Sequence, residues 1–309
     1  MEVLSELRDP TSRLAKTLTG LLALVLFGII AISTLSGFLL YQTLRPARAP
    51  MTFDLGVMMG HPTTYSFPVA NGASREGWFF PGLRAAPTVV VCHGYRSQRA
   101  EVLTLVSALQ DHGFNVFTFD FTGHGTSPGV TTLGYQETAE LRSAVTALSK
   151  RDDVDHRHFG LWGTDMGGYV ALQVAASDTR IAAFAVDDAY NSPRDMVQVQ
   201  VKHSGLTILP FVGGFADLEF RLVNYNFHDQ PAVTTRLWKT AGIPKLFIES
   251  DDRPELAADT LKLFIAAPEP KQTTRDSTSY SDMSDDDRRN YENQVVDFFL
   301  KNLPPVPAP

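Results

Sequence analysis

A short apolar run passes directly into a helical pattern in FGLWGTDMGGYVALQVAA, residues 159–176. Residues 159–162 have the length and character of a buried strand, and residues 166–176 have the spacing of a helix. Between them Gly163 and Gly167 flank a single carboxylate, Asp165. Glycine suits places where a backbone turns sharply or passes close to another. The stretch therefore predicts a strand, a tight turn that presents Asp165, and a helix.

The same alternation of strand and helix continues on both sides of this stretch. Residues 88–92, TVVVC, are a β-branched run that predicts a buried strand ending at His93-Gly94. An antiparallel pair, 63–67 and 77–80, precedes it around the turn-like Asn71-Gly72. The other predicted strands are 115–121, 181–186 and 245–249, and the other helices are 99–112, 135–149, 254–266 and 286–302. This order predicts an α/β fold, a mostly parallel sheet with helices on both faces.

The alternation is interrupted between residues 190 and 240, where no clean strand pattern is found. We expect a lid-like insertion there, over the carboxyl ends of the strands where such folds bind ligands. One domain then covers residues 60–303, and the proline-rich tail 304–309 is expected to be extended and unpacked.

The N-terminal part has a different composition. Residues 18–41, LTGLLALVLFGIIAISTLSGFLLY, contain no charged side chain over 24 residues, and about 20 apolar residues suffice to cross a bilayer. A cleaved signal peptide is the alternative, because Ala47–Ala49 is an A-x-A site, although signal sequences have shorter apolar regions. We expect one uncleaved membrane-spanning helix at 18–41, with a cytoplasmic segment 1–17 before it and a linker 42–59 after it.

The basic residues on the two sides of this span indicate its orientation. Arg8, Arg13 and Lys16 precede it, whereas Arg45 and Arg48 follow it. Because the side richer in Lys and Arg stays in the cytoplasm, we expect a single-pass protein whose soluble domain is periplasmic or extracellular.

Composition excludes several functional classes. The chain has 309 residues and a net charge of −7, so it lacks the basic surface of a nucleic-acid binder. Cys92, the single cysteine, excludes an internal disulfide and a cysteine-based zinc site. Acidic residues do follow the predicted strands, but aspartate is common in turns and no calcium-loop spacing is present, so we expect no metal and no cofactor. They are Asp120, Asp165, Asp187, Asp188, Glu249, Asp251 and Asp252.

Three motifs in order resemble the α/β-hydrolase family, and most closely its serine aminopeptidase and dipeptidyl-peptidase-like branch. They are HGY at 93–95, DFTGHG at 120–125 and GTDMGG at 163–168, and the resemblance covers roughly residues 60–303. It implies the α/β-hydrolase fold, with the nucleophile at the centre of a G-x-S-x-G elbow. It also implies an oxyanion site made by the backbone N–H groups of Tyr95 and Met166, and a pocket containing His93, Gly94 and His124.

The chain departs from the family at every member of the catalytic triad. Asp165 replaces the nucleophilic serine, and Tyr280 stands where the family has its histidine. Arg253 falls at the position of the triad acid, with Asp252 one residue before it. No histidine follows His228, so the general base of a triad on the last loop is absent. The resemblance therefore implies a fold that has lost serine-hydrolase activity and serves in ligand binding or scaffolding.

Two roles remain open for Asp165. Haloalkane dehalogenases and epoxide hydrolases resemble this arrangement and use an elbow aspartate as nucleophile, but they also need the missing histidine. His93 or His124 would have to replace it, although the resemblance gives each a structural role. Alternatively, the Asp165 carboxylate, in its ionised form, occupies the oxyanion position and caps the helix that begins at Met166. We favour the second role and keep an active hydrolase of esters, amides or peptides as the alternative.

Overall fold

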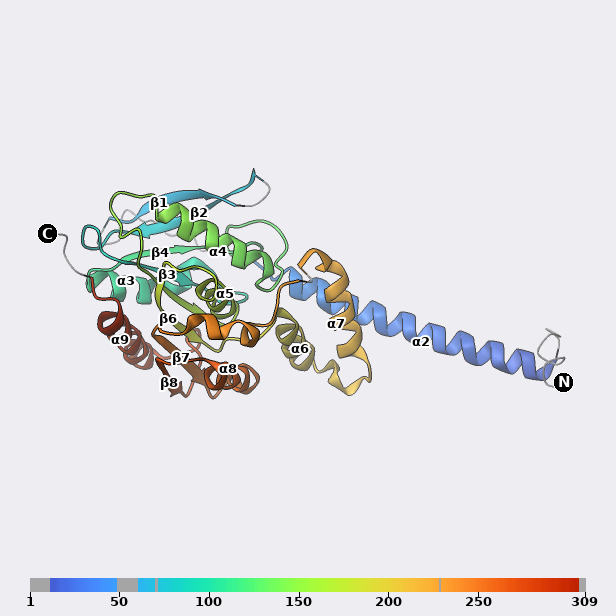
Figure 1. Ribbon diagram of the computed structural model, residues 1–309. Coiled ribbons are helices and arrows are strands. Elements are labelled where there is room, and N and C mark those ends of the chain that lie inside the picture. Colours follow the sequence, from blue (N-terminus) through green and yellow to red (C-terminus); the bar gives the residue numbers. More distant parts are fainter. Residues whose placement is uncertain (1–11, 49–60, 70–71, 228, 306–309) are drawn as a thin grey trace. The chain divides into compact units, whose positions relative to one another are not determined.

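The computed structural model describes residues 12–48, 61–69, 72–227 and 229–305 (Figure 1). These residues form two compact units. The smaller unit holds helix α2 (Arg13–Leu44) as far as Thr43, together with Val197–Tyr225, and the rest of the described chain forms the larger unit. Four expected features lie wholly or partly outside the described residues: the segment 1–17, the linker 42–59, the Asn71-Gly72 turn and the tail 304–309.

In the described chain the larger unit is built on an eight-stranded sheet, in the order β1-β2-β4-β3-β5-β6-β7-β8. Strands β1, β2 and β4 pair antiparallel, and the other neighbours pair parallel. The mostly parallel sheet and its antiparallel start are therefore confirmed. The strands are β1 (Thr63–Pro68), β2 (Ser74–Phe80), β3 (Thr88–Cys92), β4 (Asn115–Phe119), β5 (Phe159–Thr164), β6 (Ile181–Asp187), β7 (Lys245–Ser250) and β8 (Lys271–Asp276).

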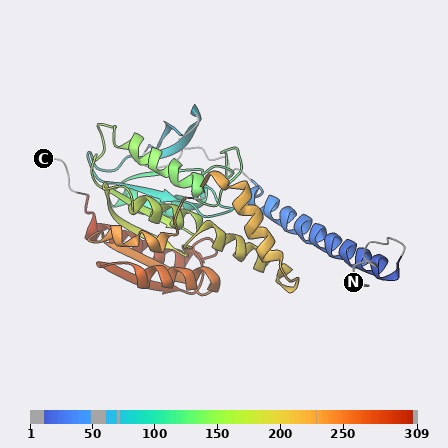
Figure 2. The ribbon, with the colours of Figure 1, turned by 45° about the vertical axis from the view of Figure 1, so that its right-hand side comes forward.

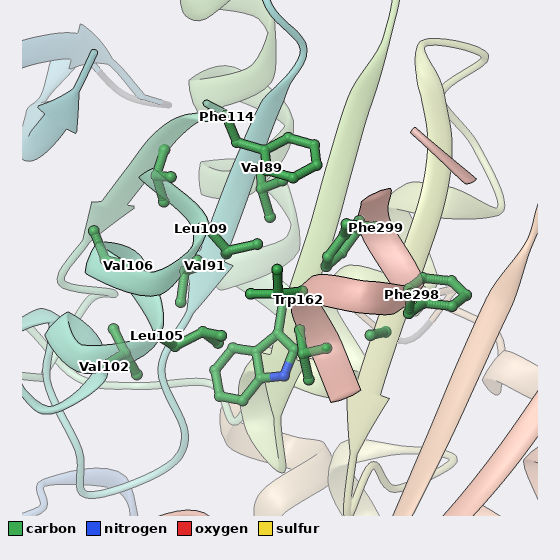
Figure 3. Packing of buried hydrophobic residues seen from close by; sticks show 14 of the residues in the cluster. Val89, Val91, Val102, Leu105, Val106, Leu109, Phe114, Trp162, Phe298 and Phe299 are labelled. Carbon is green, nitrogen blue, oxygen red and sulfur yellow. The ribbon is translucent and has the colours of Figure 1, made fainter. Parts of the chain in front are cut away.

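Helices cover both faces of this sheet, as the sequence predicts. Helices α3 (Leu103–Asp111) and α9 (Asp285–Asn302) contact each other on one face, where Val89, Val91 and Trp162 point (Figure 3). Side chains alternate along a strand, so Val90 and Leu161, also fully buried, point to the other face. There α5 (Met166–Ala175) packs on β5 and β6, next to α4 (Tyr135–Leu148).

Two further segments are the one between β6 and β7 and the one that follows β7. Between β6 and β7 the described residues contain helices and no strand, in agreement with the interrupted pattern there; the longer ones are α6 (Pro193–His203) and α7 (Val212–Val223). Beyond β7, α8 (Pro254–Ala266) leads to β8, a strand that the sequence did not predict. Strand β8 reads KQTTRD and is partly exposed throughout, so it lacks the apolar pattern by which the other strands were found.

Close backbone contacts explain the two glycines around Asp165. A Cβ atom on Gly167 would lie 2.3 Å from the carbonyl oxygen of Cys92, and one on Gly163 would lie 2.4 Å from the carbonyl carbon of Gly167. Any larger residue would push these backbones apart. The ends of β3 and β5 and the start of α5 therefore meet backbone to backbone, which fixes the turn that carries Asp165.

Helix α2 in the smaller unit is long and apolar enough to cross a membrane. Its most apolar 18-residue window has a mean hydropathy of 2.4, and none of that window is buried. A core helix of a soluble protein would bury most of such a surface. Helix α2 is therefore a candidate transmembrane span at the N-terminus.

Candidate functional site

Asp165 lies in the tight turn between β5 and α5. Its backbone has φ 46° and ψ −104°, a conformation that costs a non-glycine residue about 1–3 kcal/mol. The side chain is almost fully buried, at 4% exposure for the residue. Gly94 leaves room for it, because a Cβ atom there would lie 3.1 Å from Asp165 Oδ2. The turn therefore holds a strained, buried carboxylate at the carboxyl end of the parallel strands.

Two backbone N–H groups bind the Asp165 carboxylate. Tyr95 N–H donates to Asp165 Oδ1 at 3.1 Å, and Met166 N–H donates to the same oxygen. The side chain thereby caps α5 at its N-terminus, as the sequence analysis expects. These are the two N–H groups that the family resemblance assigns to an oxyanion, and here they are occupied by the protein's own carboxylate.

Arg253 faces the other oxygen of the same carboxylate. Its Nη1 lies 3.6 Å from Asp165 Oδ2, and its Nη2 donates to Ser281 Oγ at 2.7 Å and lies 3.5 Å from Asp282 Oδ2. The Arg253 side chain is 28% exposed, whereas that of Asp165 is 6% exposed. The residue at the predicted acid position thus reaches Asp165, but as a cation rather than as an acid. Sequence reasoning missed Ser281 and Asp282, its partners on the last loop.

Burial and the polar partners of Asp165 act on its pKa in opposite directions. Loss of solvation raises the pKa of the Asp165 carboxyl to about 6, although Arg253 and the N–H groups of Tyr95 and Met166 act in the opposite direction. The two N–H groups of the cap favour the ionised form, as the sequence analysis expects, but burial outweighs them in the net pKa. The carboxylate loses more by leaving water than it regains from one cation 3.6 Å away and two N–H groups.

Two further carboxyl groups share Arg253. Asp188 Oδ1 accepts from Ser250 N–H at 3.0 Å, and Ser250 Oγ donates to Asp188 Oδ2. Burial raises the pKa of Asp188 to about 6 and that of Asp187 well above its usual value, and Arg253 lowers both. The sequence placed these residues at the end of one strand but gave no sign of their link to Arg253, because that link joins two separate strand ends.

Asp252 and Tyr280, the other predicted triad positions, bind elsewhere. Asp252 accepts from Ser279 N–H at 2.9 Å and from Ser279 Oγ at 3.0 Å, so it ties two loops together. Tyr280 points into the core, where its ring lies 5.2 Å from that of Trp162 and its hydroxyl donates to Glu292 Oε1 at 2.8 Å. A large apolar ring is stabilised by this burial, which explains why Tyr280 does not occupy a histidine's place beside Asp165.

The two histidines near the site also have structural contacts. His93 Nδ1 lies 2.8 Å from Gly94 O, and His93 Nε2 accepts from Phe121 N–H at 3.1 Å, so both ring nitrogens are engaged. His124 Nδ1 lies 3.1 Å from Thr122 O, while its buried Nε2 has no hydrogen-bond partner. Burial lowers the pKa of both rings to about 4. Both are therefore neutral near pH 7, and His93 has no nitrogen left to activate a water.

A small pocket opens beside His124. It measures about 70 Å³ and is lined in part by Arg48, Arg96 and Ser97, a space for about two water molecules. Asp165 is not among the lining residues. Within the described ranges no group of three or more His, Cys, Asp or Glu side chains could hold a metal ion.

Comparison with known proteins agrees with this architecture. A family model described as the alpha/beta hydrolase fold matches residues 87–241, half of the chain. The chain belongs to the α/β-hydrolase fold family. The uncharacterized protein YfhR of Escherichia coli (strain K12) is 28% identical over 250 residues, 77% of this chain and 81% of YfhR.

Two other similar proteins carry names that describe an activity. A polyketide transferase of Penicillium sp is 30% identical over 121 residues, 38% of this chain, and the match spans 41% of that protein. An esterase of Pyrococcus furiosus superposes with a TM-score of 0.67 at 18% identity, covering 84% of this chain and 98% of the esterase chain. At that identity the superposition establishes the shared fold alone.

Proposed function

We propose that this protein is a membrane-anchored member of the family that has lost serine-hydrolase activity and acts by binding a ligand or as a scaffold. The observation that carries the proposal is the position of the Asp165 carboxylate on the N–H groups of Tyr95 and Met166. A serine hydrolase holds the oxyanion of its substrate with such donors. Here a substrate oxygen would have to displace a buried carboxylate that also faces Arg253.

The absence of a general base supports the same proposal. No histidine follows His228 in the sequence, and Tyr280 is a phenol whose pKa is raised further by burial. Neither Tyr280 nor Asp252 could take a proton from a serine at position 165. We also propose that the chain comes from the serine aminopeptidase-like branch of the family and that its catalytic triad is degenerate. The three triad positions are then Asp165, Arg253 with Asp252, and Tyr280.

The purified full-length protein should therefore be unreactive toward substrates of serine hydrolases. We expect no covalent adduct with a fluorescent fluorophosphonate, and p-nitrophenyl butyrate turnover equal to that of Asp165→Asn. The variant Asp165→Ser should also stay unlabelled, because its hydroxyl would have no base beside it. Ester turnover that disappears in Asp165→Asn would overturn the proposal.

The alternative is an active hydrolase of esters, amides or peptides that uses Asp165 or relocated groups. The strained backbone of Asp165 favours it, because such strain is concentrated at functional sites. The name of one relative, a polyketide transferase that is 30% identical over 121 residues, points the same way. The turnover assay above separates the two functions, since only the alternative predicts a rate that depends on the Asp165 carboxylate.

We also propose that α2 anchors the protein with its large domain on the periplasmic or extracellular side. Three basic residues precede the uncharged run 18–41 and two follow it, and the more basic side stays in the cytoplasm. Protease added to intact spheroplasts that express the full chain should digest the large domain. Full protection would contradict this topology, and a mature chain beginning at Pro50 would show a cleaved signal sequence instead.

A further inference from the structure

Helix α7 is hydrogen-bonded to helix α2 within the smaller unit. Ser33 Oγ donates to Glu219 Oε1 at 2.8 Å, and Ser36 Oγ donates to Glu219 Oε2 at 2.8 Å. Gly37 faces the same carboxylate, since a Cβ atom there would lie 3.6 Å from Glu219 Oε2. Both oxygens of the Glu219 carboxylate are thus held by hydroxyl groups of α2. Helix α7 lies beside α2 in both ribbon views (Figures 1 and 2).

This contact lies inside the apolar run of α2, not at its end. Ser36 and Ser33 precede Tyr41, the last residue of the uncharged run, by about 8 and 12 Å along the helix at 1.5 Å per residue. The hydrocarbon core is about 30 Å thick, so both serines lie at hydrocarbon depth when residues 18–41 span the bilayer. A carboxylate is costly at that depth unless it has partners, and here two hydroxyl groups supply them.

The surface around this contact is apolar. In α7, Leu218 and Leu222 are four residues apart on one face and are 49% and 65% exposed. The charged pair Asp217 and Arg221, also four apart, lies on a neighbouring face. The loop before α7 is equally apolar, with Ile208 at 85% and Phe211 at 73% exposure. The exposed large apolar residues of the segment Leu206–Val223 are Ile208, Leu209, Phe211, Leu218, Leu222 and Val223.

We propose that the segment Leu206–Val223 inserts into the lipid leaflet that holds the C-terminal half of α2, with its apolar face against the acyl chains. The inference rests on the proposed membrane anchor. The apolar surface of the segment is continuous with that of α2. Glu219 fixes α7 to α2 at hydrocarbon depth, and the exposed apolar side chains of the segment extend the lipid-facing surface of α2. This part of the insertion between β6 and β7 is thereby a membrane-embedded element.

Quenching by lipid tests this assignment in the full-length chain. Single cysteines replace Ile208 and Leu222 in the segment, Phe27 in α2 (70% exposed) and Ile265 in α8 (68% exposed). Each variant is labelled with an environment-sensitive nitrobenzoxadiazole dye and placed in phosphatidylcholine vesicles that carry doxyl groups on their acyl chains. The unsubstituted chain, whose single cysteine Cys92 is buried, gives the background.

We expect the quenching at Ile208→Cys and at Leu222→Cys to approach the quenching at Phe27→Cys. It should exceed the quenching at Ile265→Cys about fivefold, because only a dye inside the bilayer contacts the doxyl-labelled acyl chains. Quenching at Phe27→Cys alone would overturn the inserted segment and leave the anchor intact. Equal quenching at Ile265→Cys would overturn it as well, because the contact would not be specific to the segment. Absence of quenching at Phe27→Cys would overturn the anchor and the inference together. Phe211→Cys and Leu218→Cys provide a second pair if either first variant fails to fold.

Discussion

Arg253→Met should lower the free energy of unfolding by about 3 kcal/mol near pH 8, since removing one partner of a buried ion pair leaves the other charge uncompensated. Four carboxyl groups, those of Asp165, Asp187, Asp188 and Asp282, interact with this guanidinium. Methionine keeps most of the side-chain volume and removes the charge. Guanidinium-chloride unfolding of the full chain, followed by tryptophan fluorescence, measures the loss. It should shrink toward pH 5, because Asp165 and Asp188 take up protons near pH 6.

Arg275→Met is the matched control for this variant. Arg275 also pairs with two carboxylates, Asp251 at 2.6 Å and Glu249 at 4.0 Å, but its side chain is 63% exposed. Exposed pairs are screened by water and contribute little. The Arg253 variant should therefore lose far more stability than the control, and adding Asp165→Asn to it should recover part of the loss. Equal losses in the two arginine variants would show that Arg253 does not compensate buried charge.

Asp165→Asn should gain stability relative to the parent as the pH rises from 4 to 7. The folded-state pKa of Asp165 is about 6, above the unfolded value of about 3.9, so between these values the folded state holds more protons and the parent loses stability as pH rises. The gap corresponds to about 3 kcal/mol. Asparagine keeps an oxygen for the two N–H groups but has no proton to lose. Unfolding curves at intervals of half a pH unit would show the trend.

Asp153→Asn should show a trend of opposite sign, at lower pH. Hydrogen bonding to Arg151 lowers the pKa of the Asp153 carboxyl, so its contribution is present above the unfolded pKa and is lost as pH falls through the folded one. That variant should therefore lose stability relative to the parent only as pH rises to about 4, and the difference should stay flat from pH 4 to 7. If the difference between Asp165→Asn and the parent were flat from pH 4 to 7, the carboxyl group would not be desolvated in the turn.

The sequence predicted the parts of the fold that depend on local pattern. Apolar runs such as residues 88–92 became buried strands, and the glycines around Asp165 marked a turn where backbones touch. The cap on α5 followed from position alone, since Asp165 directly precedes the helix. Each of these inferences needs only neighbouring residues, and the structure confirms all three.

The candidate site was predicted less completely, because its contacts join distant segments. Tyr280 was aligned with a catalytic position, yet its ring packs in the core and Ser281, the next residue, contacts Arg253 instead. Arg253 interacts with both Asp165 and Asp188 because the order of the strands in the sheet brings their ends together. The raised pKa of Asp165 depends on burial, which no local pattern reports.

The polar sequence of β8, because of which this strand was not predicted, also affects self-association of the protein. Strand β8 is the last in the sheet and leaves one side of its backbone without a neighbouring strand among the described residues. An apolar strand in that place would be a template for edge-to-edge aggregation. Lys271, Arg275 and Asp276 place charged side chains on this strand, which buries none of its residues fully. Two copies meeting at this edge would have to bury these charged side chains, which disfavours pairing of one sheet with another.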